Sequence, residues 1–301
     1  MTYSSGNTIL AADYNTFVGT VNTVIGPSAS LQSGTGYNQS TLSTVAASAT
    51  VGASEWGTLI TAVKTAATHQ GTTVDLPAAN PSAGDLIEAL DGTTASSTTY
   101  NLSAAVTAIN SNKDNVAAGQ QTTIAGSAAS TRASAWASTI DAVIDCAFAS
   151  QAAMDGFFNT GGEIHLTFQH PNGTTSQDND WRDIFNNKIG TLKLGKSYMS
   201  RTGSSGTIAA SGYTSLTTSY TAFFTGTNIG SGAYGANDVT VTAKHNGTST
   251  VSFTITLSDQ HAAISPSTVD SVAAGTAVSV GFRRSSVYTP ATPTVSASNG
   301  F

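Results

Sequence analysis

The spacing of the apolar residues changes near residue 130 of this 301-residue chain. Before that point, apolar residues recur every three or four positions, which is typical of amphipathic helices. Beyond it they alternate with polar residues, which is typical of strands with one buried face. Helices followed by strands indicate an α+β protein or separate domains. We therefore predict an α+β fold with a small helical N-terminal part and an antiparallel, β-rich, sandwich-like C-terminal domain that carries short helices.

An internal repeat with an offset of about 42 residues lies in the helical part, within the range of periods of duplicated structural units. Residues 9–18 align with residues 51–60, and each copy begins a predicted helix. Each helix has an acidic residue in its first turn, Asp13 or Glu55, where the helix dipole favours negative charge. Ser54 is the predicted N-cap of the second copy.

The two helices of the repeat carry their apolar residues at helical spacing. These residues are Tyr14, Phe17, Val18, Val21 and Ile25 in the first helix and Trp56, Leu59, Ile60, Val63 and Ala67 in the second. Two weaker helices are predicted at 85–90 and 102–116. All four are short and rich in Ala and Thr, so we expect them to dock on one another or on a neighbouring subunit.

Short elements with strand spacing follow in the second part of the chain. The alternation at 139–148 favours a strand, with a helix as the competing interpretation. Asn246-Gly247 separates two alternating runs and predicts a hairpin with a type I′ turn. Asn179 or Asp180 is the predicted N-cap of the helix that carries Trp181. Further elements are a helix at 151–159 and strands at 163–169, 191–194 and 277–282.

These signals divide the chain into four predicted segments. They are a helical assembly and anchoring domain at 1–120, a Gly/Ser/Ala linker at 121–132, a β-rich domain at 133–287 and an extended C-terminal tail at 288–301. The residues predicted for packing and assembly are Tyr14, Phe17, Trp56, Leu59, Phe157, Phe158 and Trp181.

No motif for catalysis or cofactor binding occurs in the sequence, such as a Gly-x-Ser-x-Gly elbow, a Walker loop or a Rossmann fingerprint. An odd separation on a strand points His165 and His170 to opposite faces, which disfavours a shared metal ion. The acidic residues of 178–183 lack the Gly and Glu that complete an EF-hand loop. We predict no enzyme, no cofactor and no metal site, although the two carboxylates of a glycosidase can be distant in sequence and such a pair stays open.

Charged residues make up only 9% of the chain, against about 25% in ordinary soluble domains. Such a composition suits a protein that identical neighbours or partners cover, and it also suits an exported adhesive or surface-layer protein. A net charge of −6 with 11 Lys and Arg argues against nucleic-acid binding. Arg283-Arg284 is expected to pair with carboxylates or to lie at a subunit boundary, and Cys146 is expected to be a small buried residue.

Three stretches resemble a group of virion structural proteins from tailed bacteriophages, including cyanophages. They are Tyr3-Ser4-Ser5-Gly6 with residues 9–15, Thr68-His69-Gln70-Gly71-Thr72, and Phe157-Phe158-Asn159-Thr160-Gly161-Gly162-Glu163-Ile164. The resemblance covers nearly the full length, and the last string is its most specific motif. The C-terminal region departs from the usual pattern by a shorter tail that is richer in Ser and Thr, so contact roles are not transferred.

The resemblance implies a component of the phage particle without established catalysis. Such genes lie near tail and receptor-binding genes in some phages, which favours a tail, collar or fibre. A capsid decoration or cement protein and a host-surface glycan-binding module are the alternatives. The expected partners are other virion proteins and copies of the chain. With neither a signal peptide nor the roughly 18 apolar residues of a membrane span, we expect synthesis in the bacterial cytoplasm, release by lysis and a location in the virion.

Overall fold

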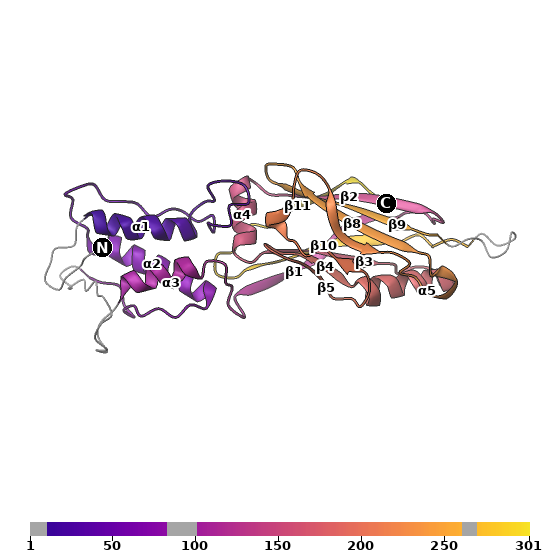
Figure 1. Cartoon of the computed structure of the whole chain (residues 1–301), viewed down its shortest axis with the longest axis horizontal. Helices are drawn as coiled ribbons and strands as arrows, with labels where there is room; N and C mark the ends of the chain where they lie inside the picture. The colour runs from indigo at the N-terminus through magenta and orange to yellow at the C-terminus, as the bar shows by residue number, and fades with distance from the viewer. Residues whose placement is uncertain (1–10, 83–100, 261–269) are drawn as a thin grey trace. The chain divides into compact units, whose positions relative to one another are not determined.

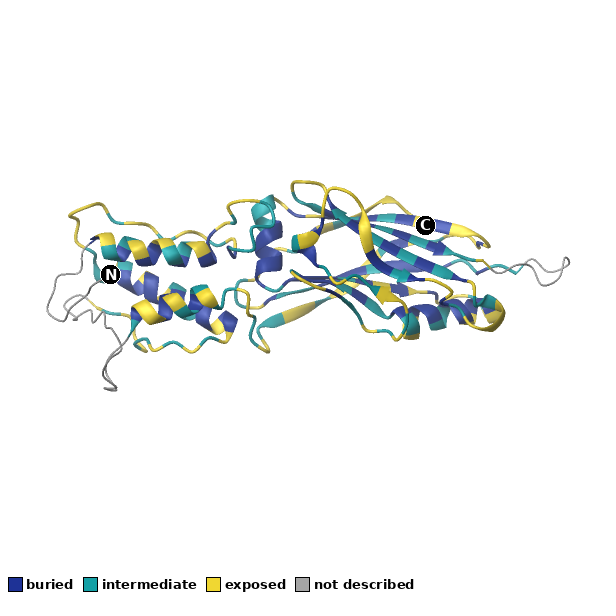
Figure 2. Cartoon of the chain, in the orientation of Figure 1, coloured by how far each residue is buried: buried dark blue, intermediate teal, exposed yellow. Residues whose placement is uncertain are grey.

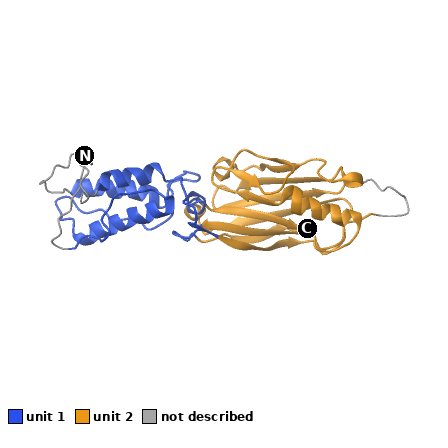
Figure 3. Ribbon diagram, turned by 90° about the horizontal axis from the view of Figure 1, so that it is seen from below, with its two compact units in different colours: residues 1–122, 155–161, 285–290 blue, residues 123–154, 162–284, 291–301 orange. Residues whose placement is uncertain are grey.

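The structure is a computed structural model that describes residues 11–82, 101–260 and 270–301 (Figure 1). Helices lie mainly in the N-terminal part and antiparallel strands form two sheets after it, which confirms the predicted α+β fold. The chain divides into two compact units (Figure 3). The helical unit comprises residues 1–122, 155–161 and 285–290, and the sheet unit comprises residues 123–154, 162–284 and 291–301.

Three helices build most of the helical unit: α1 (Ala11–Ile25), α2 (Ala53–Gln70) and α3 (Leu102–Ser111). The apolar faces predicted for the two copies of the repeat are buried in one shared core (Figure 2). Tyr14 and Trp56 occupy equivalent positions in the two copies. Their rings meet edge to face with centroids 5.3 Å apart, a favourable geometry for aromatic pairs.

The helix ends differ from the predictions at two places. α2 begins after Gly52, which has no side chain for a cap, and the hydroxyl of Ser54 donates to the carboxylate of Glu55 at 3.0 Å instead of capping the helix. α3 ends before the predicted Val116, because Asn112 leaves the helical conformation and its carbonyl accepts a turn bond from the N–H of Asn115 at 2.9 Å. The helix predicted at 85–90 lies outside the described residues.

Two asparagines of α1 hold a segment without regular secondary structure, residues 37–46, against the helix. The side-chain amide of Asn15 donates to the carbonyl of Val45 at 2.8 Å and accepts from its N–H at 2.9 Å. Asn22 makes the same pair of bonds with Leu42, at 3.0 and 2.7 Å. Asn15 and Asn22 are two helical turns apart, and Leu42 and Val45 are three residues apart. Both separations span about 10 Å, so each asparagine can reach its partner. The two side-chain amides thus supply hydrogen bonds to the backbone of this segment, as a neighbouring strand would in a sheet.

The sheet unit consists of two antiparallel sheets whose inner faces are buried (Figure 2). The five-stranded sheet has the order β1-β10-β3-β4-β5, and the six-stranded sheet has the order β11-β2-β9-β8-β7-β6. The first sheet contains β1 (Gln121–Thr131), β3 (Glu163–Gln169), β4 (Thr191–Leu194), β5 (Met199–Arg201) and β10 (Ala277–Ser285). The second contains β2 (Thr139–Ala147), β6 (Thr207–Ile208), β7 (Thr221–Gly226), β8 (Asp238–His245), β9 (Thr250–Ser258) and β11 (Thr294–Asn299).

Two segments that were predicted to lack regular structure contain strands. The predicted linker at 121–132 is wrong, because residues 121–131 form β1, which lies beside β10. Within the predicted tail at 288–301, β11 pairs antiparallel with β2. A Gly/Ser/Ala-rich composition has weak strand propensity, but a neighbouring strand supplies backbone hydrogen bonds whatever the side chains are. The strand predicted at 139–148 is confirmed as β2, and the competing helix is wrong.

The predicted hairpin is confirmed as β8 and β9, but its turn differs. A type I′ turn needs positive φ at both central residues. Only Gly247 of the Asn246-Gly247 pair has positive φ, at 84°. The loop instead closes around the side chain of Asn246, whose Oδ1 accepts from the N–H groups of Thr248, Ser249 and Thr250 at 2.9 to 3.0 Å.

The remaining helical elements are short: α4 (Gln151–Asn159), α5 (Ser176–Asp183) and the π-helical segment η1 (Ile184–Ile189). The N-cap of α5 is Thr175, which forms a reciprocal capping box with Asp178. The predicted caps Asn179 and Asp180 are wrong, because both residues lie inside the helix. The helix therefore begins earlier than the apolar pattern around Trp181 indicates.

Replacing the central tryptophan of the helical unit tests its packing. Trp56→Ala is expected to lower the free energy of unfolding by about 3–5 kcal/mol, because it leaves a cavity beside Tyr14 in a buried core. The measurement is chemical denaturation followed by circular dichroism. Thr58→Ala, at an exposed position of the same helix, is the control. Unaltered unfolding of the Trp56 variant would contradict the described core.

Removing one asparagine pair tests how residues 37–46 are held. Asn22→Ala is expected to cost on the order of 1–2 kcal/mol, because two part-buried hydrogen bonds to Leu42 are lost. Hydrogen exchange should show faster exchange of the Leu42 amide. Thr23→Ala, which removes an exposed hydroxyl on the next residue, should leave that exchange unchanged. Equal exchange rates in the two variants would show that the asparagine does not hold the segment.

Candidate assembly surface

The residues predicted for packing all lie in the interior. Tyr14, Phe17, Trp56 and Leu59 come together in the core of the helical unit, and each is at most 2% exposed. Phe157 and Phe158 of α4 are fully buried and pack edge to face at 5.2 Å. Trp181 lies apart from them in the sheet unit, against Trp136 and Phe185. Each of these side chains packs inside its own unit, and their part in assembly stays a prediction.

The candidate metal ligands do not gather. His165 contacts Glu163, whereas His170 contacts Asp178. Asp183 contacts Asn187 instead of Asp178. Among residues 11–82, 101–260 and 270–301, no group of three or more His, Cys, Asp and Glu side chains could hold a metal ion.

A buried hydrogen-bonded chain that the sequence did not reveal links three elements of the sheet unit. His170 bonds the hydroxyl of Thr276 at 3.1 Å through Nδ1 and the carboxylate of Asp178 at 3.0 Å through Nε2. Trp136 donates to the same hydroxyl at 3.1 Å. The order of hydroxyl, imidazole and carboxylate is that of a catalytic triad. All three are buried, so no substrate can reach the hydroxyl, and the chain supports the fold.

A carboxylate network lies on the polar face of the five-stranded sheet. Glu163 accepts from Nε2 of His165 at 2.6 Å and from the hydroxyl of Tyr198, and its carboxylate lies 3.5 Å from the guanidinium of Arg283. Burial raises the pKa of Glu163, but the partners outweigh burial and lower the pKa to about 2. The carboxylate therefore stays ionised, which suits support between strands and does not suit proton transfer.

Sequence reasoning anticipated part of this network. Strand alternation places Glu163 and His165 on one face, and Arg283 was expected to pair with a carboxylate, which is confirmed. Tyr198 was missed, because it precedes a strand of only three residues that has no detectable alternation. Cys146 is buried as expected, and burial raises the pKa of its thiol, so it is a poor nucleophile.

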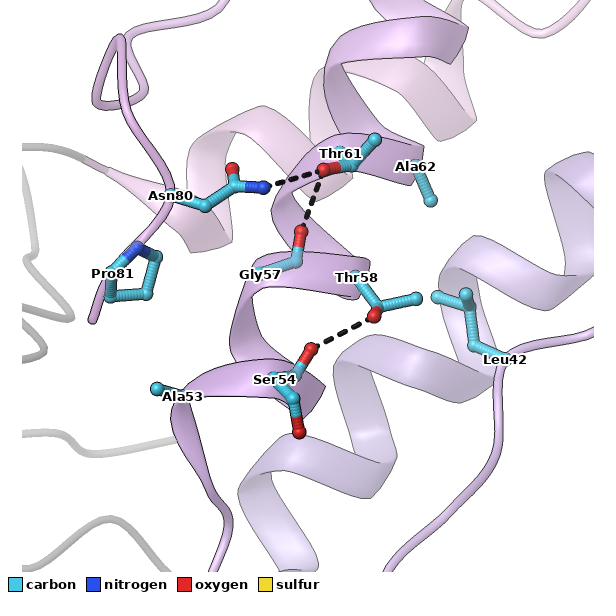
Figure 4. Close-up of a pocket in the computed structure, with 9 residues that line it drawn as sticks. All are labelled: Leu42, Ala53, Ser54, Gly57, Thr58, Thr61, Ala62, Asn80 and Pro81. Atoms are coloured by element: carbon cyan, nitrogen blue, oxygen red, sulfur yellow. Dashed lines mark hydrogen bonds between the residues drawn. The ribbon is translucent and has the colours of Figure 1, made fainter. Parts of the chain in front are cut away.

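An open groove of about 510 Å³ lies along α2 (Figure 4). Its walls are Leu42, Ala53, Ser54, Gly57, Thr58, Thr61, Ala62, Asn80 and Pro81. The amide of Asn80 donates to the hydroxyl of Thr61 at 2.9 Å on one side of the groove. The lining offers hydroxyls, one amide and apolar carbons without a charged side chain, so it provides a contact surface and no groups for acid–base chemistry.

A long and largely exposed strand, β1, forms one edge of the five-stranded sheet. Within the described part of the chain β1 has one neighbour, β10. Seven of its 11 residues are exposed, and residues 125–128 are exposed in succession, on both faces of the strand. Ordering the backbone of each residue costs roughly 1–2 kcal/mol of conformational free energy. In β1 this cost is offset mainly by hydrogen bonds to β10, because the strand buries little apolar surface.

A pair of glycines brings β1 close to β10. A Cβ on Gly281 would lie 3.0 Å from the amide nitrogen of Gly126, and a Cβ on Gly126 would lie 3.2 Å from that of Gly281. Real side chains at these positions would push the two backbones apart. The paired glycines thus keep the edge strand close to the sheet even though its side chains contribute little packing.

The edge strand of the second sheet lies on the same flank. The N–H of Phe301, just beyond β11, donates to the hydroxyl of Ser130 in β1 at 2.8 Å. We name this side, bounded by the edges of β1 and β11, the open flank. Neither edge strand contains a charged residue, and charge is a common protection of exposed strand edges.

Comparison with known proteins gives no relative: no family model matches the chain, and no curated protein or solved structure is similar to it. In the described residues, no helix has the length and apolar character needed to cross a lipid bilayer. The surface of the molecule is therefore the basis for a functional proposal.

The carboxylate network predicts a pH-dependent stability. Because the folded pKa of Glu163 lies near 2, below its ordinary 4.5, the stabilisation is complete above pH 4.5 and fades as the pH falls towards 2. Glu163→Gln should cost on the order of 2 kcal/mol at pH 7 and much less near pH 2. Urea unfolding at both pH values measures this, with Asp141→Asn on the exposed face of β2 as control. A cost that is independent of pH would contradict the ionised network.

Proposed function

We propose that this chain is a non-enzymatic structural component of a tailed-phage particle, in the tail, collar or fibre, which acts through protein–protein contacts. The observation that carries the proposal is the open flank. It presents strand edges without charged residues on a chain whose composition is unusually poor in charge. Such edges are templates for pairing with another chain, and natural monomers usually protect them.

The polar clusters of the chain favour a structural role over a catalytic one. The Thr276–His170–Asp178 chain is buried, and the carboxylate of Glu163 is engaged by several partners. Each cluster links strands or helices that are distant in sequence. The resemblance of residues 157–164 to virion structural proteins supports a location in the phage particle. The proposed partners are other virion proteins and copies of the chain.

The alternative of a capsid decoration protein would use the same open flank, since it too is mainly interface. The glycan-binding alternative has less support, because all three tryptophans are buried. Of the large hydrophobic residues in the described segments, Tyr198 and Tyr220 are the exposed ones. Tyr198 donates to Glu163, and the ring of Tyr220 lies 4.3 Å from the ammonium of Lys244, so neither is a free stacking platform.

The test is to locate the protein in particles of the phage that carries its gene. We expect quantitative mass spectrometry of purified particles to find the chain in a fixed ratio to the tail proteins, and antibody labelling in electron micrographs to mark the tail. Tail-less heads from a tail-assembly mutant provide the control. Heads that carry the chain in a fixed ratio would support the decoration role, and absence from purified particles would contradict a structural role altogether.

A further inference from the structure

The four edges of the two sheets are protected to different degrees. β5 has three residues and β6 has two, so both offer short edges. β11 has six residues, follows Pro293, and its register with β2 is interrupted between Ala297 and Asn299. β1 has 11 residues and contains no proline. Of the described edges, β1 is therefore the longest. Near its C-terminal end the hydroxyl of Ser130 accepts a hydrogen bond from the N–H of Phe301, whereas residues 125–128 are exposed.

Charge is absent along the whole of β1 and beyond it. No Lys, Arg, Asp or Glu occurs between Asp114 and Arg132, although the chain carries a net charge of −6. Two copies of an anionic protein repel each other, and they approach most easily where neither surface carries charge. The β1 edge meets this condition, because its side chains are small or hydroxylic except for two larger uncharged ones, Gln121 and Ile124, which are both half-buried.

We infer that β1 pairs with β1 of a second copy, antiparallel and about a two-fold axis, so that the two five-stranded sheets become one continuous sheet. This inference rests on the proposed function and names its first partner. A two-fold contact uses the same surface on both copies and closes on itself. Antiparallel pairing of an uncharged strand with itself meets no like charges. The pairing also fills the hydrogen-bonding edge of β1 that has no neighbour among the described strands.

The pairing accounts for two features of β1. Residues 125–128 are exposed on both faces, so side-chain burial does little to order them in a single copy. A second strand would supply backbone bonds along this stretch without requiring any particular side chain. The close contact of Gly126 with Gly281 keeps this poorly packed strand in place beside β10, so that it could serve as a template for a further strand.

Lysine substitution on the full-length chain tests the inference. Ala125 is exposed on β1, and Ala125→Lys would bring like charges close together across the two-fold axis. Ala147→Lys is the matched control, since Ala147 is exposed on β2, whose two edges are filled by β11 and β9. Sedimentation equilibrium should show a dimer for the unaltered chain and for Ala147→Lys. For Ala125→Lys, the dissociation constant should rise at least about tenfold.

Cysteine cross-linking locates the axis. Cys146 is the only cysteine and is fully buried, so it gives no background. The variants Thr123→Cys, Ala125→Cys, Ser127→Cys and Ala128→Cys, made one at a time, should form disulfide-linked dimers under mild oxidation, most efficiently at the position nearest the axis. Ala147→Cys should stay unlinked. Folding of each variant is checked by thermal unfolding.

The outcomes separate this inference from the proposed function. A monomeric chain at all concentrations would overturn the pairing, and so would a dimer that Ala125→Lys leaves unaltered. A dimer that depends on β1 in a chain that is absent from particles would uphold the pairing and contradict the structural role. A chain that is found in particles but is monomeric in solution would contradict the pairing and uphold the structural role.

Discussion

The structure depends on finding partners for backbone outside the helices. Every buried N–H and C=O must be hydrogen-bonded, and this chain has few charged side chains with which to supplement that bonding. In the helical unit, the amides of Asn15 and Asn22 serve as partners for residues 37–46. In the loop between β8 and β9, Asn246 gathers successive N–H groups. In the sheets, strands pair with strands. At the open flank, the edge strands β1 and β11 have no neighbouring strand on one side among the described residues. For that reason the functional proposal centres on this flank.

Sequence patterns predicted those parts of the fold that side-chain burial determines. The two helices of the repeat and the alternating strands β2 and β9 each carry a continuous apolar face, and the structure buries those faces. The failures occur where backbone bonding decides the conformation. β1 contains no apolar pattern, so its composition resembled a linker. The turn at Asn246 and the cap at Thr175 depend on particular side-chain bonds whose partners the spacing of apolar residues does not reveal.

The polar clusters were only partly predictable for a related reason. Strand alternation placed Glu163 beside His165, since two residues on the same strand face are neighbours in any sheet. The contact of His170 with Asp178 and Thr276 depends on how β3, α5 and the start of β10 meet, and the three residues span more than a hundred positions. Such contacts follow from the topology, so a single sequence does not show them.

The composition of the helical unit has a consequence for how the chain is made. Although most of the unit lies in residues 1–122, it also contains residues 155–161 and 285–290. Tyr288 packs against Tyr37 and His69, with ring centroids 4.9 and 5.1 Å apart. Translation proceeds from the N-terminus, so helices α1 to α3 are synthesised well before residues 285–290, which complete their unit. Of the two units, the helical one is thus begun before the sheet unit but completed late, and its incomplete core is exposed to chaperones or proteases during elongation.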